Sequence, residues 1–151
     1  MSLRSKLAED LKSAMKAGDA ARLSTIRMMI ARQKEVDIAA RPRGVAQVGD
    51  PELIGAFRAM AKSRGEAVAL YRQGGREELA EKEEAEIRVI ESYLPARLEG
   101  EALRALVERA IAETGATGRA DMGRVMASLK ASHGTALDMA AAGALVRERL
   151  A

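Results

Sequence analysis

Few side chains in this sequence have the types and spacing that catalysis needs. The only histidine is His133 and there is no cysteine, which excludes multi-histidine triads, histidine-rich zinc sites and cysteine nucleophiles. The serines Ser24, Ser63, Ser92 and Ser128 fall in predicted helices without the Ser–Lys–Ser spacing of an activated serine. We therefore predict no catalytic residue and no cofactor. His133 itself is expected at a helix end beside carbonyl groups, with a functional role as the alternative.

The acidic cluster of residues 77–86 is a second place where chemistry could occur. Its glutamates could bind a metal, but Lys82 and Arg88 are interleaved with them at salt-bridge spacing. This pattern favours a solvated helix face, and we predict no metal site. Gly74-Gly75 lacks the strand and the lysine-containing spacing of a phosphate loop, so it indicates a joint between two helices.

Four charged residues fall within otherwise apolar helical stripes. At 100° per residue, Arg27 and Arg64 share faces with aliphatic and aromatic side chains, and Glu83 and Glu86 do the same one helix later. Charges this close to a core need partners. The first interpretation is a structural ion-pair network inside an N-terminal bundle. The alternative is a functional polar pocket, because perturbed groups also gather in such pockets.

The charge distribution permits contact with nucleic acid. Residues 1–75 contain 14 basic and 8 acidic side chains, whereas residues 76–95 contain 3 and 7. The three aromatic residues occupy core-like positions, which leaves no stacking platform for single-stranded bases. Structured RNA fits better, because phosphate contact needs only well-placed lysine and arginine. Neither DNA nor a membrane is expected as a partner. The basic candidates are Arg119, Arg124 and Lys130, with Arg41 and Arg43 in a predicted loop.

The helix predicted over about 118–132 carries the most specific of these candidates. Its buried side is predicted to contain Met122, Val125, Met126 and Leu129. Small residues line one flank, where another backbone could approach closely. The residues predicted to bind RNA or a protein partner are Arg119, Gly123, Arg124, Ala127 and Lys130.

These candidates must be positioned by helices, because no strand pattern competes with the helical periodicity. The predicted fold is all-α, with an N-terminal bundle of about four helices over residues 1–95 and a three-helix domain over residues 96–151. Asp19 and Asp50 are predicted helix N-caps, and Thr135 with Asp138 is predicted to form a capping box. The start of the chain lacks a signal-peptide pattern and no apolar run reaches 18 residues, so a cytoplasmic location is expected.

Three segments then point to a known family. LSTIRMMIARQKEVD (residues 23–37), YRQGGREELAEKEEAEIRVIESYLP (71–95) and GATGRADMGRVMASLK (115–130) resemble the GatB/YqeY family, specifically its stand-alone YqeY-like proteins. The resemblance implies an N-terminal helical domain and a C-terminal domain similar to the tail of the GatB subunit of tRNA-dependent amidotransferases. In that enzyme the tail contacts tRNA, while amide transfer and ATP use belong to other domains.

Three functions follow from this resemblance and from the residues. The leading hypothesis is a non-catalytic module that binds tRNA or a component of the tRNA aminoacylation and amidation machinery. The second is an enzyme or accessory of the carbon–nitrogen ligase type with glutamine as amido-nitrogen donor, as the family label implies. The third is a protein–protein interaction adaptor that uses the N-terminal bundle.

Overall fold

The structure is a computed structural model that describes the backbone of residues 1–151 and every side chain except that of Thr135. Its α-helices are α1 (Leu3–Ala17), α2 (Ala20–Ala40), α3 (Asp50–Gln73), α4 (Glu77–Glu91), α5 (Gly100–Thr114), α6 (Met122–His133) and α7 (Met139–Leu150). Short 3-10 turns cover Arg41–Arg43, Arg119–Asp121 and Gly134–Ala136. The described residues contain one isolated β-bridge and no strand. The predicted all-α class is confirmed.

The contacts between Cα atoms divide the chain into two compact units, Met1–Leu94 and Pro95–Ala151. The first contains α1 to α4 and the second α5 to α7. No helix among the described residues combines the length and the apolar character needed to cross a membrane.

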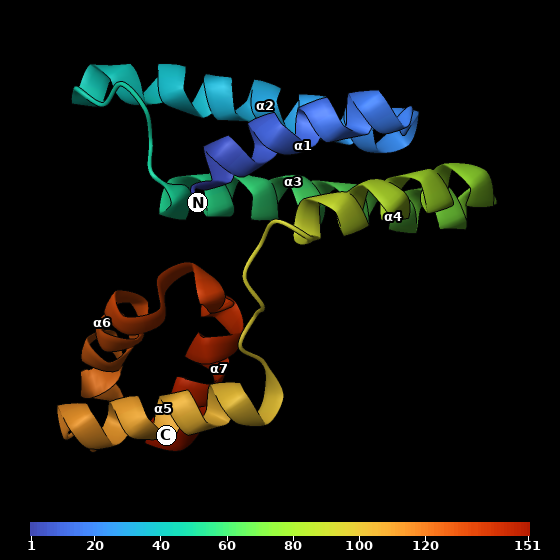
Figure 1. Cartoon of the computed structure of the whole chain (residues 1–151). Helices are drawn as coiled ribbons and strands as arrows, with labels where there is room; N and C mark the ends of the chain where they lie inside the picture. Colours follow the sequence, from blue (N-terminus) through green and yellow to red (C-terminus); the bar gives the residue numbers. More distant parts are fainter. The chain divides into compact units, whose positions relative to one another are not determined.

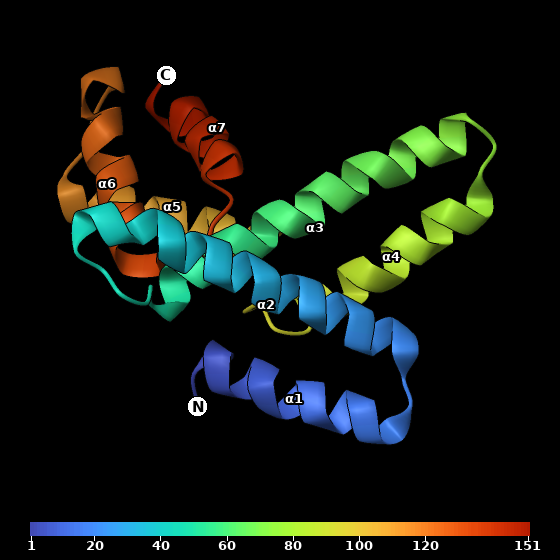
Figure 2. The same cartoon turned by 90° about the horizontal axis from the view of Figure 1, so that it is seen from above.

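In the first unit, two helix pairs lie on each other. α1 and α2 form one layer and α3 and α4 form the other (Figures 1 and 2). Leu7, Ile26, Phe57 and Ile90, one from each helix, are fully buried between them. Full burial of such a side chain contributes roughly 1.5–3 kcal/mol, so this shared core holds the four helices together.

The turn between α1 and α2 follows its sequence signals closely. Gly18 ends α1 with φ of 68°, the left-handed conformation that glycine adopts without steric cost. The Asp19 carboxylate then accepts a hydrogen bond from the Arg22 amide and caps α2. The two helices therefore reverse direction within two residues.

The cap predicted for α3 was wrong. Gly49 is the N-cap and makes no side-chain hydrogen bond, while Asp50 is the first residue of the helix. The Asp50 carboxylate instead accepts hydrogen bonds from the Leu3 amide at 3.3 and 3.4 Å. Leu3 opens α1, where the first amides lack partners inside the helix. Asp50 therefore accepts from the first amide of a different helix from the one that contains it, beside the N-cap Ser2.

The second unit packs α5, α6 and α7 around Leu103, Val107, Val125, Leu129 and Val146. The β-bridge pairs Leu98 with Leu137 and ties the segment before α5 to the segment before α7. Its hydrogen bond runs from the Leu98 amide to the Ala136 carbonyl, at 3.0 Å.

The capping box predicted for the last helix was also wrong. Asp138 itself is the N-cap of α7, and its carboxylate accepts from the amides of Ala140 and Ala141 at 3.0 and 3.2 Å. The helix consequently begins at Met139, later than the sequence suggested. The predicted role of the Thr135 side chain lies outside the described residues.

Candidate functional site

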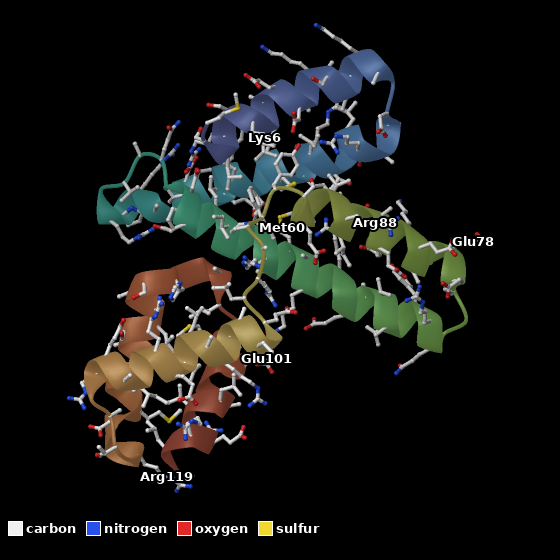
Figure 3. All side chains as sticks on the ribbon, turned by 60° about the horizontal axis from the view of Figure 1, so that its bottom comes forward. Lys6, Met60, Glu78, Arg88, Glu101 and Arg119 are labelled. Atoms are coloured by element: carbon white, nitrogen blue, oxygen red, sulfur yellow. The ribbon has the colours of Figure 1, made fainter. Side chains whose placement is uncertain are left out.

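Three of the four predicted polar-pocket residues come together between α3 and α4. The Arg64 Nε lies 3.0 Å from Glu86 Oε2 and 3.9 Å from Glu83 Oε2. One terminal nitrogen of Arg64 donates to the Met60 carbonyl at 3.3 Å, and the other lies 3.3 Å from the Met28 sulfur of α2. The three charged side chains are only 16–23% exposed. Met60 is labelled in Figure 3.

This cluster joins helices rather than presenting a free reactive group. Burial raises the pKa of Glu83, the charge of Glu86 raises it further, and Arg64 opposes both effects. All three side-chain nitrogens of Arg64 have contacts within the unit. Arg27 is not part of the cluster, because its side chain is exposed. The geometry thus fits the structural ion-pair interpretation for Arg64, Glu83 and Glu86.

A second polar cluster, which the sequence analysis missed, surrounds Tyr93. Its hydroxyl donates to Asp10 Oδ2 at 2.5 Å and accepts from Arg22 at 3.4 Å. Asp10 also lies 3.7 Å from Lys6 Nζ, which sits 5.7 Å from the centre of the Tyr93 ring; Lys6 is labelled in Figure 3. Burial and the hydrogen bond to Asp10 raise the pKa of Tyr93. The cluster attaches the residue just beyond α4 to α1 and α2.

A shallow hollow of about 330 Å³ lies along the α3–α4 pair. Its lining combines small and apolar residues with charged ones: Gly65, Val68, Ile87, Arg72, Glu84 and Arg88. Glu77 and Glu84 both pair with Arg72, which occupies that guanidinium within the protein. None of the sequence-predicted site residues lies here. Among the described residues, no three His, Asp or Glu side chains are arranged to hold a metal ion.

The predicted partner-binding residues are all exposed, four of them on α6 and one in the turn before it. The helix buries Val125 and Leu129 completely or almost so, with Met122 and Met126 half-buried beside them. The exposed set consists of Arg119, Gly123, Arg124, Ala127 and Lys130. We call these five residues the α6 flank. Arg119, in the turn before the helix, is labelled in Figure 3.

The middle of the α6 flank is formed by glycine and alanine, so no long side chain projects from the helix surface there. A Cβ atom built on Gly123 would meet no heavy atom within 4 Å, so open space lies above this residue. Ala127 follows one turn later and is also exposed. Because neither side chain projects far, another backbone or a phosphate can approach the helix closely here.

Two of the three cations on the α6 flank are free to meet an external anion. Arg124 donates to Asp121 at 2.9 Å, and the Thr117 amide occupies the other Asp121 oxygen at 2.9 Å. The Thr117 amide and the charge of Arg124 lower the pKa of Asp121 against the effect of its burial. Arg119 and Lys130 have no ion-pair partner among the described residues.

His133 is the last residue of α6 and is half-buried. Gly134 follows with φ of 47° and ends the helix. The structure therefore places His133 beside the C-terminal carbonyls of α6, as the helix-end interpretation requires.

The fold and these clusters define an all-helical protein of two compact units, in which internal ion pairs connect helices and the α6 flank faces outward. The chain belongs to the YqeY-like protein family, whose sequence profile matches residues 4–150. It is also similar to "Altered inheritance of mitochondria protein 41, mitochondrial" of the yeast Vanderwaltozyma polyspora, with 34% identity over 88 residues. That match covers 58% of this chain and 46% of the relative. The YqeY-like resemblance seen in the sequence is confirmed.

Proposed function

We propose that this protein is a non-catalytic module that binds tRNA, or a component of the tRNA aminoacylation and amidation machinery, through the α6 flank. The observation that carries the proposal is the α6 flank itself: all five predicted contact residues are exposed, and open space lies above Gly123. The resemblance of the C-terminal segment to the GatB tail supplies the class of partner.

The electrostatics of the α6 flank suit a phosphate backbone. Arg119 and Lys130 lie near opposite ends of the α6 flank, and neither makes an ion pair among the described residues. Lysine and arginine that meet phosphates release condensed counterions, which makes binding strong at low salt and weak at high salt. The small residues between them permit the close approach that such contacts require.

We take the two compact units to be separately folding domains, the first a four-helix bundle and the second a three-helix GatB-tail-like domain. We also take the protein to act in the cytoplasm, as its sequence composition led us to expect.

The test is a filter-binding titration of the full chain with bulk tRNA over a range of salt concentrations. Arg119→Ala with Lys130→Ala should weaken binding and flatten the slope of log K against log salt by roughly 2, because two phosphate contacts are lost. Lys62→Ala with Arg88→Ala is the matched control, since it removes the same charge from exposed positions of α3 and α4.

Absence of binding at low salt, or equal slopes for both double variants, would eliminate RNA as the ligand of the α6 flank. Capture of proteins that survives nuclease treatment would instead favour the adaptor hypothesis. Glutamine-dependent ammonia release by the isolated chain would favour the carbon–nitrogen ligase hypothesis.

A further inference from the structure

A row of three cations follows the outer face of α2 in the first unit. Arg27, Lys34 and Arg41 are seven residues apart, which places them nearly in line on a helix of 3.6 residues per turn. All three side chains are exposed. Arg41 caps α2 with helical angles, φ −56° and ψ −42°, so the row continues in register to its end. At 1.5 Å per residue it is about 21 Å long.

The cations of this α2 row lack the acidic neighbours that most exposed cations of the unit have. Lys62, Lys82 and Arg88 each have a glutamate three or four residues away on their own helix. Along the α2 row only Asp37 stands at that spacing, from both Lys34 and Arg41. Arg4 engages both oxygens of Asp37, at 2.7 and 2.5 Å. No ion pair among the described residues includes a member of the row.

The side chains between the cations are small or aliphatic. Ala31 and Ile38, which is 55% exposed, complete the face. One aliphatic side chain provides far less apolar surface than a membrane-lying helix needs. The row also lacks the aromatic anchors and pockets that concentrate energy in protein interfaces. In Figure 2, α2 lies over α3 with no helix of its own unit drawn above it.

A regular row of exposed cations that make no ion pair among the described residues is complementary to a regular row of phosphates. We propose that the α2 row Arg27–Lys34–Arg41 is an RNA-contacting surface that binds the phosphate backbone of a base-paired stem. Without aromatic residues on this face, single-stranded bases would have nothing to stack on, so the paired form of RNA is the ligand. The choice of RNA over DNA rests on the proposed function; the row itself is an independent observation in the other unit.

The experiment measures fluorescence anisotropy of a labelled RNA hairpin with the full chain, over a series of salt concentrations. The triple variant Arg27→Ala, Lys34→Ala, Arg41→Ala should bind at least about tenfold more weakly at low salt. The slope of log K against log salt should fall by roughly 2 to 3, since each phosphate contact contributes about 0.9. Alanine favours helix at these exposed positions, so the fold should persist, which far-ultraviolet circular dichroism will verify.

Two control variants show whether binding depends on the position of the cations or only on the net charge of the protein. Lys62→Ala, Lys82→Ala, Arg88→Ala removes the same charge from α3 and α4 and should leave both affinity and slope close to the wild type. Arg27→Lys with Arg41→Lys keeps the charge of the row and should preserve the slope. Equal losses in the two triple variants would overturn the proposal, because binding would then follow net charge alone.

The α6 variant Arg119→Ala, Lys130→Ala is measured on the same hairpin, so that the two surfaces are judged separately. An effect of the α2 triple variant without an effect of the α6 variant supports the row and removes the α6 flank. An effect of the α6 variant without an effect of the α2 triple variant overturns the proposal for the α2 row and supports the proposed function. Tighter binding to a DNA hairpin of equal length, or row-dependent binding to phosphatidylserine vesicles with unchanged RNA affinity, also overturns the assignment to RNA.

Discussion

Arg4 and Asp37 join the first turn of α1 to the last turn of α2, with two guanidinium nitrogens 2.7 and 2.5 Å from the two carboxylate oxygens. Both residues also hold the loop that follows α2. Arg4 donates to the Val48 carbonyl at 2.8 Å, and Asp37 accepts from the Val48 amide at 2.9 Å. Val48 is consequently buried, at 3% exposure. One ion pair thus fixes two helices and the end of the 41–49 loop.

This arrangement predicts acid sensitivity of the first unit. The hydrogen bonds from Arg4 lower the pKa of Asp37 to about 2, with further help from the Val48 amide and the charge of Arg41 and against the effect of burial. The pKa of an aspartate in the unfolded chain is about 3.9. The stabilisation is therefore complete above pH ~4 and is lost as the pH falls toward ~2.

The measurement is the free energy of unfolding from urea titrations at several pH values, for the wild type and for Asp37→Asn. The variant should be less stable at pH 7 and should lose less stability between pH ~4 and ~2. Glu35→Gln, which alters the exposed Arg32–Glu35 pair, is the control and should follow the wild type. Parallel acid profiles for Asp37→Asn and the wild type would contradict this account.

The hydroxyl group of Tyr93 should stabilise the first unit through its hydrogen bond to Asp10. Tyr93→Phe removes the hydrogen bond to Asp10 and keeps the buried ring, which is 6% exposed. Loss of a hydrogen bond to a charged group should lower the free energy of unfolding by roughly 1.5–3 kcal/mol. Tyr71→Phe changes the other tyrosine, which is half-buried. Its hydroxyl has no hydrogen-bond partner among the described residues, so this variant should have little effect. Equal effects in thermal unfolding would show that the Asp10 contact contributes nothing.

Glu83 should have the opposite pH dependence from Asp37. Burial, with the nearby charge of Glu86, raises its pKa, so the folded state holds a proton that the unfolded state releases. Stability should therefore increase as the pH falls through the raised pKa toward the ordinary glutamate value of about 4.3. Glu83→Gln should abolish this increase and be at least as stable as the wild type at pH 7. Glu78→Gln, an exposed site on α4, should retain the increase.

The helices and their ends followed from short-range signals in the sequence. Gly18, Gly74 and Pro95 are local breakers, and the helices before them end within a few residues of these positions. The buried and exposed sides of α6 were predicted for the same reason, because helical periodicity alone separates Val125 and Leu129 from Gly123 and Ala127. Predicting these features requires no knowledge of contacts between residues that are distant in the sequence.

Contacts between distant residues were not predictable in this way. The Asp50 carboxylate accepts from the Leu3 amide of α1, although 47 positions separate the two residues. Arg4 pairs with Asp37 rather than with acids nearer in the sequence because of how the helices pack. Arg27 was assigned to an apolar stripe, yet it lies about 100° around the helix from Ile26, where no neighbour covers it. A helical wheel shows on which side of the helix a side chain lies, but it does not show which sides are covered by other helices.

The two compact units should unfold independently. Phe57→Ala removes a fully buried ring from the first unit and should cost roughly 3–5 kcal/mol, and Leu129→Ala in the second should cost roughly 2–5. Amide hydrogen exchange should accelerate only in residues 1–94 for the first variant and only in residues 95–151 for the second. Acceleration throughout the chain in either variant would show a single cooperative domain.

Gly123 allows the shape of the α6 flank to be tested apart from its charge. Gly123→Ala places a Cβ in open space and should stabilise the second unit by up to about 1 kcal/mol, through helix propensity. Gly123→Leu should fold equally well but hold a partner away from the helix, so RNA affinity should fall while the salt slope changes little. Gly65→Leu in α3 also projects into open space and is the matched control. If both leucine variants bind RNA like the wild type, close approach at Gly123 is not required, and only the cations of the α6 flank remain as its means of binding.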